Sequence, residues 1–272
     1  MLWNAKNGKL KLGDAEMDYI RFGSGAQTLV ILPGLGDCLR TVKGTAVPMA
    51  AMYREFAGDF TVYSFSRKSP LPEGYTTRDM ARDQAEAMEA LGIERAHIFG
   101  VSMGGMIAQW LAIDHPEKVE RLVLAVTSAE PNPILTESIG EWVALAGAGD
   151  TAGFMRSNLR RMYSDAYCRK NLWMAPIAGR LTRPKSYDRF FIQANACLTH
   201  NAADHLHQIR AGTLVLGGEQ DKALGGEASR KIAAAIDGAA LKMYPQWGHA
   251  LYEEEKTFNR TVGSFLRNGQ EK

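Results

Sequence analysis

The stretch Ile98-Phe99-Gly100-Val101-Ser102-Met103-Gly104-Gly105 lies between an apolar segment and a segment with helical spacing of its apolar residues. It contains the pattern G-x-S-x-G, in which a serine occupies a sharp turn from a strand into a helix. Glycines two positions before and after Ser102 lack the Cβ atoms that would crowd such a turn. The helix N-terminus behind the serine offers amide N–H groups to a developing oxyanion. The stretch predicts a nucleophilic serine; the alternative is a glycine-rich turn that only packs a helix on a sheet.

The composition of the 272-residue chain is that of a globular protein with a sizeable core, at 46% hydrophobic and 23% charged residues. Its length fits one large α/β domain with an insertion. A formal net charge of +2 gives no sign of the basic face of a nucleic-acid-binding protein, so we expect no nucleic-acid partner. No apolar run reaches the ~18 residues of a membrane span, and the first eight residues lack the apolar core of a signal peptide.

The three cysteines, Cys38, Cys168 and Cys197, form neither an even framework nor a C-x-x-C pair. This usage is typical of reduced thiols in the cytosol, so we expect a cytoplasmic protein.

Short apolar runs alternate with segments of helical spacing along most of the chain. A hairpin is expected around Gly13-Asp14. The predicted later strands are 28–32, 60–65, 96–99, 121–126, 213–217 and 240–244, and the predicted helices are 45–57, 76–91, 103–115, 226–236 and 251–266. Such alternation is typical of a mostly parallel sheet with helices on both faces. Within the helix after Ser102, Trp110 is expected to face the core.

The alternation stops after Val126, and residues 130–201 have helical spacing with no convincing strand. We therefore expect a core made of residues 1–129 and 206–272, with residues 130–205 as an inserted helical cap. Basic residues concentrate in this segment: Arg156, Arg160, Arg161, Arg169, Lys170, Arg180, Arg183, Lys185 and Arg189. They either steer an anionic substrate or form a solvated face or subunit contact.

Large apolar residues of the same segment have two interpretations as well. They line an acyl-binding pocket, or they form the internal core of the cap. The residues concerned are Met155, Met162, Trp173, Met174, Phe190 and Phe191.

A serine hydroxyl needs a base to accept its proton and a carboxylate to orient that base. His249 follows the last predicted strand, in Gln246-Trp247-Gly248-His249-Ala250, and Asp221 follows the strand before it. The carboxyl ends of parallel strands meet at one edge of the sheet, which predicts that these side chains converge with Ser102. Glu219 and Glu130 are alternative carboxylates. The order Ser102, Asp221, His249 is the one associated with the strand-to-helix turn.

The remaining histidines fit other roles. His97 lies at the start of a predicted strand, on the opposite edge from the cleft, and His115 lies at a helix C-terminus, where the helix dipole explains it. His200 lies between cap and sheet. His205 and His207 are two positions apart, and such residues do not share a helix face, so we expect no metal site.

Two backbone amides are candidate oxyanion donors. Leu35 follows the first core strand in Pro33-Gly34-Leu35-Gly36, and Met103 follows the serine. Neither contribution depends on a side chain.

Taken together, the Ser102 pentapeptide, the Pro33–Gly36 loop, Asp221 and Gly248-His249 make the chain resemble the α/β-hydrolase superfamily over nearly everything outside the cap. The resemblance implies an eight-stranded, mostly parallel sheet, a helical lid, and a serine-dependent hydrolase without a cofactor.

The chain departs from common family patterns at two loops. It has Pro33-Gly34 where many relatives have His-Gly, and Phe65-Ser66-Arg67-Lys68 where many have an Asp-x-Arg-Gly turn. Backbone donation by Leu35 survives the first change. Ser102 itself argues against the chemistry of haloalkane dehalogenases, which use aspartate at this position.

The reaction we expect is hydrolysis of a small carboxylic ester through an acyl-enzyme, with a small-molecule acyl substrate as the partner. A C–C bond hydrolase, a thioesterase or a lactonase uses the same three residues, and a ligand-binding receptor on the same fold is an alternative of another class. A homodimer is compatible with the basic face of the cap.

Overall fold

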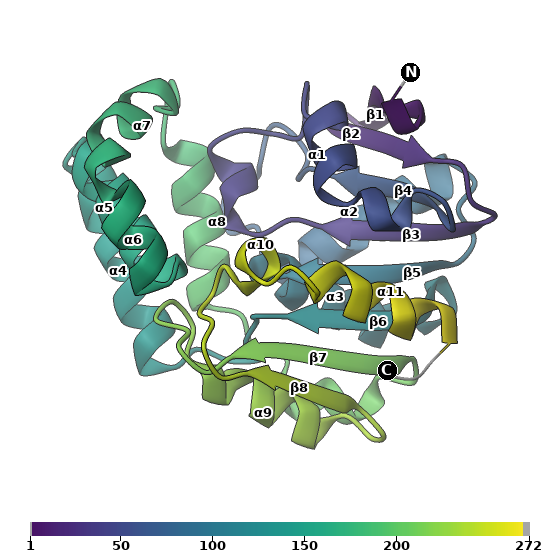
Figure 1. Ribbon diagram of the computed structural model, residues 1–272. Helices are drawn as coiled ribbons and strands as arrows, with labels where there is room; N and C mark the ends of the chain where they lie inside the picture. The colour runs from purple at the N-terminus through teal and green to yellow at the C-terminus, as the bar shows by residue number, and fades with distance from the viewer. Residues whose placement is uncertain (1, 269–272) are drawn as a thin grey trace.

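The computed structural model describes residues 2–268, which form a single eight-stranded sheet flanked by helices (Figure 1). The strand order is β1-β2-β4-β3-β5-β6-β7-β8. Strands β1 (Lys6–Leu12) and β2 (Ala15–Gly23) form the predicted antiparallel hairpin, with Gly13 at a positive φ of 58° in its turn. β2 also pairs antiparallel with β4 (Phe60–Phe65). The antiparallel pairs therefore lie at one edge of the sheet.

All the other neighbouring strands pair in parallel. They are β3 (Gln27–Leu32), β5 (Ala96–Val101), β6 (Val119–Ala125), β7 (Gly212–Gly218) and β8 (Ala240–Tyr244). Every residue of β5 is buried, as expected for an interior strand covered on both faces. The predicted mostly parallel, eight-stranded sheet with helices on both faces is confirmed.

Helices cover the two faces of the sheet and create two apolar cores. One core includes residues of α2 (Thr77–Ala90), α3 (Met103–Asp114) and α9 (Gly226–Ala235). The other includes residues of α1 (Ala46–Met52) and α11 (Phe258–Asn268). The interior strand β5 is thus covered on both faces, whereas the edge strand β1 keeps exposed residues along its length.

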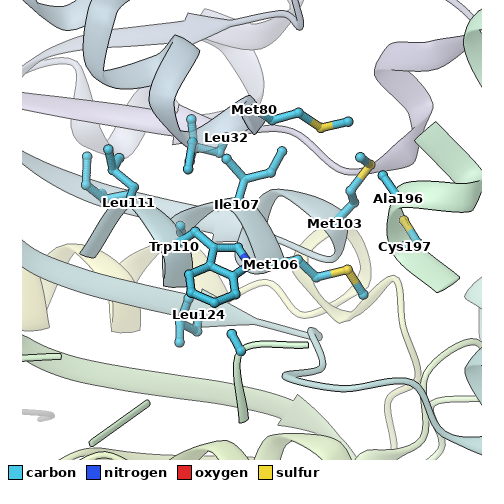
Figure 2. Packing of buried hydrophobic residues seen from close by; sticks show 14 of the residues in the cluster. Leu32, Met80, Met103, Met106, Ile107, Trp110, Leu111, Leu124, Ala196 and Cys197 are labelled. Carbon is cyan, nitrogen blue, oxygen red and sulfur yellow. The ribbon is translucent and has the colours of Figure 1, made fainter. Parts of the chain in front are cut away.

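Helix α3 lies behind Ser102 and is held by its apolar face. Figure 2 shows Ile107, Trp110 and Leu111 of this helix together with Leu32 and Leu124 of the sheet. Trp110 is buried, as predicted, and the guanidinium of Arg78 lies 4.5 Å from its ring centroid. This packing anchors the N-terminus of α3 at the carboxyl edge of the sheet.

The start of α2 follows the predicted capping pattern. The Thr76 side chain accepts the Asp79 N–H, and the Asp79 carboxylate accepts the Thr76 N–H. The helix ends before Gly92, which has a φ of 68°.

The expected helices 45–57 and 251–266 are interrupted. The first divides into α1 and a short 3-10 helix η3 (Arg54–Phe56), and the second into α10 (Leu251–Glu254) and α11. The N–H and hydroxyl of Thr257 both donate to Glu255 Oε1, at 2.8 and 2.7 Å. Such local side-chain bonds compete with helical hydrogen bonds, and they accompany the break between α10 and α11.

Between β6 and β7 the described chain is helical. The elements are α4 (Pro133–Gly147), α5 (Thr151–Met162), α6 (Asp165–Asn171), η5 (Leu172–Met174), α7 (Ala175–Leu181), α8 (Asp188–Leu198) and η6 (Ala203–Gln208). Figure 1 shows α4 to α8 beside the carboxyl ends of the parallel strands. We call residues 133–198 the helical insertion; their assignment to a cap with boundaries 130–205 stays a prediction. No helix within residues 2–268 is both long enough and apolar enough to cross a membrane.

Candidate active site

Ser102 lies in the turn from β5 to α3 and has φ 54° and ψ −123°, a strained conformation for a residue with a side chain. The surrounding packing maintains it. The Ser102 N–H donates to Ala125 O at 2.9 Å, and Thr127 Oγ1 donates to Ser102 O at 2.7 Å. A Cβ on Gly104 would overlap the carbonyl oxygen of Leu32, so this position of the turn requires glycine.

Ser102, His249 and Asp221 form a continuous hydrogen-bonded chain. His249 Nε2 lies 2.9 Å from Ser102 Oγ, and His249 Nδ1 lies 2.8 Å from Asp221 Oδ2. The other carboxylate oxygen of Asp221 accepts the N–H groups of Ala223 and Leu224, at 2.8 and 2.9 Å. Asp221 and His249 are both buried. The structure therefore brings together the three residues that the sequence singled out, with the geometry of nucleophile, base and orienting acid.

The alternative carboxylates lie in ion pairs of their own. Glu219 pairs with Arg230, and Glu130 pairs with Lys231 at 3.1 Å. Asp221 alone of these three carboxylates is hydrogen-bonded to His249.

The two candidate oxyanion donors lie at helix starts next to the serine. Leu35 is the first residue of the 3-10 helix η2 (Leu35–Cys38), and Met103 is the first residue of α3. Amides at these positions have no acceptor within their own helix. An added Cβ on Gly34 would lie 3.3 Å from Ser102 Cβ, which shows how closely this loop approaches the serine. Leu35 lines the cavity that contains Ser102, and the role of the two amides as oxyanion donors stays a prediction.

The loop that carries Leu35 is held by a buried network that the sequence analysis missed. Arg67 is fully buried and donates from Nη2 to Pro33 O at 2.6 Å, while its N–H donates to Asp37 Oδ2 at 3.0 Å. Arg189 of α8 donates to the same Asp37 oxygen at 3.0 Å and to the carbonyl oxygens of Arg67 and Lys68. Arg67 therefore directly supports the Pro33-Gly34 loop, which differs from the His-Gly loop of many relatives. The sequence offered one clue: Arg67 occupies the arginine position of the Asp-x-Arg-Gly turn, although the Asp and Gly of that turn are replaced.

The basic residues of the helical insertion do not surround Ser102. None of the nine lines the cavity onto which Ser102 opens. Arg189 is paired with Asp37, and Arg161 is paired with Glu137 and Glu141. Arg156, Arg160 and Arg169 line a separate hollow of about 920 Å³. Their charges face a different surface from the serine.

The other histidines lie away from the serine. His97 packs edge-on against Phe60, and burial lowers its pKa to about 4. His200 contacts Thr77 Oγ1 at 2.8 Å and Gln109 Oε1 at 3.3 Å, and burial lowers its pKa to about 3. His205 packs on the Trp110 ring. Within residues 2–268 no group of three or more His, Cys, Asp or Glu side chains is arranged to hold a metal ion.

Ser102 and His249 open onto a cavity of about 420 Å³. The helical insertion contributes Met155, Met162 and Phe190, three of the six large apolar residues considered for an acyl pocket, together with Trp142 and Phe154. Trp173 and Met174 are instead 68% and 43% exposed, and Phe191 packs on the core. Met49, Met52 and Tyr53 complete the wall from the side of α1. The cavity is mostly apolar and of a size that suits a small organic molecule.

The end of α5 is joined to the segment that carries His249. The Ala250 N–H donates to Met162 O at 2.8 Å, and the Tyr163 hydroxyl donates to Glu253 Oε2 at 2.6 Å. Ser164 donates from its N–H and its hydroxyl to the two carboxylate oxygens of Glu254. The segment that carries His249 is thus supported by the helical insertion as well as by the sheet.

The chain is similar in sequence to known hydrolases. At 28% identity the chain is similar to a 2-hydroxy-6-oxononadienedioate/2-hydroxy-6-oxononatrienedioate hydrolase of Paraburkholderia xenovorans, with 95% of this chain and 93% of that protein covered. A second hydrolase of that name, from Pseudomonas putida, is 27% identical over 94% of this chain and 93% of its own length.

Solved structures share the fold. An α/β hydrolase from a deep-sea metagenome library, MGS-M2, superposes with a TM-score of 0.85 at 22% identity, over 97% of this chain and 98% of the other. The enol-lactonase of Burkholderia xenovorans LB400 gives a TM-score of 0.82 at 21% identity, over 96% and 100%. The sequence pattern described as the alpha/beta hydrolase fold matches residues 27–256. This chain is therefore a hydrolase that belongs to the α/β-hydrolase fold family.

Proposed function

We propose that the protein is a serine hydrolase that cleaves a small carboxylic ester through an acyl-enzyme intermediate. The observation that carries the proposal is the hydrogen-bonded chain from Asp221 through His249 to Ser102, which ends at a mostly apolar cavity of about 420 Å³. In this arrangement Ser102 is the nucleophile, His249 the general base and Asp221 the residue that orients it.

In the first half-reaction His249 Nε2 accepts the Ser102 proton while Oγ attacks the acyl carbonyl carbon. The proton on Nδ1 stays in the bond to Asp221, which selects the reactive tautomer and stabilises the imidazolium that forms. The amides of Ala223 and Leu224 hold the second oxygen of Asp221, so the carboxylate keeps its orientation during the proton transfer.

The tetrahedral intermediate carries its negative charge on the former carbonyl oxygen. Leu35 and Met103 are the proposed donors to this oxygen, because they are the first residues of η2 and α3, the two helices that begin next to Ser102. His249 then protonates the leaving alkoxide. A water molecule attacks the acyl-enzyme, with His249 again taking the proton, and Ser102 is regenerated.

The helical insertion is the proposed cap of this site. Its residues Trp142, Phe154, Met155 and Phe190 line the same cavity as Ser102, so acyl chains bound there are removed from water. The enclosed volume favours short to medium acyl groups or aromatic esters over polymers.

The decisive experiment is turnover of 4-nitrophenyl butyrate by the wild type and by Ser102→Ala. The variant lacks the nucleophile, so we expect kcat to fall at least about 10⁴-fold. Ser24→Ala, at an exposed serine, is the matched control and keeps wild-type turnover. Near-native activity of Ser102→Ala contradicts the proposal. Labelling of Ser102 by a fluorophosphonate separates an active enzyme from a receptor-like protein on the same fold.

A second candidate is hydrolysis of a C–C bond, which is favoured by the names of the relatives from Paraburkholderia xenovorans and Pseudomonas putida. The same serine, histidine and aspartate serve that reaction. Parallel assays of nitrophenyl esters, a lactone, an acyl thioester and a vinylogous 1,5-diketone distinguish these reactions by their relative kcat/KM. A higher kcat/KM for the diketone than for every ester favours the second candidate.

A further inference from the structure

One part of the cavity wall is polar and anionic. Tyr53, Tyr163, Tyr252 and Glu253 all line the cavity that contains Ser102 and His249. They converge from three places in the fold: the end of α1, the end of α5, and α10. Together they place one carboxylate among three aromatic rings, in a cavity whose other walls are mainly apolar.

Glu253 has neutral hydrogen-bond partners and no cationic one. The Tyr163 hydroxyl donates to its Oε2 at 2.6 Å, and no ion pair within residues 2–268 joins Glu253 to a basic side chain. Desolvation by the surrounding side chains raises the pKa of Glu253, and this outweighs the hydrogen bonds from Tyr163 and Tyr252, which lower it. The neighbouring Glu254 raises this pKa as well. Among residues 2–268 the carboxylate therefore lacks a basic ion-pair partner.

The three tyrosines remain neutral around it. Burial, and then the charge of Glu253, raise the pKa of both Tyr53 and Tyr163 above the ordinary phenol range. Burial and Glu253 act on Tyr252 in the same direction. Neutral phenol rings present electron-rich faces, which attract organic cations.

The other charged groups of the cavity are accounted for differently. Asp37 is paired with Arg189. Arg40 also lines the cavity; its side chain is exposed, as that of Glu253 is, and no ion pair within residues 2–268 joins the two. A cationic ligand group placed beside Glu253 meets a carboxylate that is paired with no basic side chain of the described residues.

We propose that this end of the cavity binds an alkylammonium group of the substrate, with Glu253 as its counter-charge and the tyrosine rings as its walls. The inference rests on the proposed function, because the group belongs to an ester whose carbonyl lies at Ser102. It also predicts poor turnover of dianionic substrates, since a carboxylate beside Glu253 is repelled.

The test uses two esters of nearly identical shape, butyrylcholine and 3,3-dimethylbutyl butyrate, which differ in one positive charge. We expect the wild type to show a kcat/KM at least about tenfold higher for the cationic ester. In Glu253→Gln the ratio of the two kcat/KM values falls to within about threefold of unity. Glu227→Gln, on α9, removes a charge elsewhere and keeps the wild-type ratio. A wild-type ratio near unity, or a ratio unchanged in Glu253→Gln, overturns the inference.

A measurement without substitution covers the case in which Glu253→Gln fails to fold. Neither ester titrates between pH 4.5 and 8, and any group that acts equally on both esters cancels in the ratio. The pKa of Glu253 is raised above its ordinary value of 4.5, so more than half of this carboxyl is protonated at pH 4.5, and the wild-type ratio falls toward unity as the pH is lowered from 8 to 4.5. A ratio that is constant from pH 8 to pH 4.5 contradicts the inference.

Binding to an inactive protein separates this inference from the proposed function. Tetramethylammonium is titrated into Ser102→Ala and into Ser102→Ala with Glu253→Gln, and heat is measured. A dissociation constant that rises at least about tenfold in the double variant supports the cation site. If neither ester is hydrolysed but this rise is observed, only the proposed function fails. Hydrolysis of both esters with equal tetramethylammonium binding by the two proteins leaves the esterase and overturns the cation site.

Discussion

Ser164 and Glu254 are joined by two hydrogen bonds, from the Ser164 N–H to Oε2 at 2.9 Å and from its hydroxyl to Oε1 at 2.6 Å. The pair connects the junction of α5 and α6 to α10, five residues beyond His249. Together with the bond from the Ala250 N–H to Met162 O, it makes the helical insertion part of the support of the proposed base.

Glu254→Ala removes both acceptors and leaves the Ser164 donors unpaired. We expect kcat to fall about tenfold while KM changes less than about threefold, because the His249 segment loses a support that acts on the base. Loss of the two bonds costs about 1–3 kcal/mol of unfolding free energy. Steady-state kinetics with a nitrophenyl ester and urea denaturation check this. Glu227→Ala is the control, and a change in KM alone contradicts the positioning role.

Asp221→Asn presents an amide in place of the acceptor for His249 Nδ1–H, which favours the wrong tautomer of the imidazole. A fall in kcat of about 10⁴-fold is expected, by analogy with the same change in serine proteases. Glu219→Gln serves as the matched control at the nearby carboxylate and keeps activity within about twofold. Comparable losses in both variants would mean that Asp221 is not the specific partner of His249.

Gly104→Ala introduces a Cβ into the carbonyl oxygen of Leu32. Since backbone atoms of a buried strand end cannot move aside cheaply, the free energy of unfolding should fall by more than about 3 kcal/mol. Gly140→Ala in α4 is the contrasting variant, because a Cβ there meets no atom within 4 Å. It should stabilise the protein by about 0.5–1 kcal/mol through helix propensity. Chemical denaturation of both variants tests the pair; equal stabilities refute the packing argument.

Arg189→Met leaves the buried Asp37 carboxylate with its backbone donor but without its ion-pair partner. The expected loss of unfolding free energy is about 3–5 kcal/mol, the range for removing one member of a buried pair. Arg183→Met, at an exposed position, is the control and should change stability by less than about 0.5 kcal/mol. Wild-type stability of Arg189→Met would show that Asp37 finds another partner.

Stability should decrease as the pH falls from 7 to 5, because His97 and His200 are held neutral by burial in the folded protein. Their folded pKa values, about 4 and about 3, lie below the unfolded value, so below pH 6.5 the unfolded chain binds more protons. Each of the two histidines lowers the free energy of unfolding by about 2 kcal/mol between pH 7 and pH 5.

His97→Leu removes one of these contributions, so its loss of stability between pH 7 and pH 5 should be smaller than that of the wild type by about 2 kcal/mol. The exposed His207→Gln should retain the wild-type dependence. Urea denaturation at the two pH values measures the difference. Parallel curves for His97→Leu and the wild type would show that His97 is accessible to protons in the folded state.

Most of the sheet and the position of the candidate site follow from local patterns. The apolar run of 240–244 coincides with β8, and the capping residues Thr76 and Asp79 set the start of α2. The glycines around Ser102 mark a turn that few other residues tolerate. Parallel strands place their carboxyl ends along one edge, so Ser102, Asp221 and His249 are predictable as neighbours from their places after three strands.

Other features depend on contacts between distant parts of the chain. Arg189 and Asp37 are 152 positions apart, and Tyr163 and Glu253 are 90 apart. The spacing of apolar residues does not predict such long-range pairs. The sequence therefore did not show which basic residues of the helical insertion form ion pairs and which lie on the surface. The break between α10 and α11 was equally hidden, because helical spacing continues across Glu255 and Thr257 while their side chains bond locally.

The amino-acid sequence by itself determined the α/β sheet, the strained serine turn and the order of the three polar residues, since these rest on local periodicity and turn chemistry. The tertiary structure alone decided the distances within that chain of residues, the lining of the cavity, and the placement of Glu253 among three tyrosines. These features arise where α1, α5 and α10 meet, and the meeting point is set by packing of the whole fold.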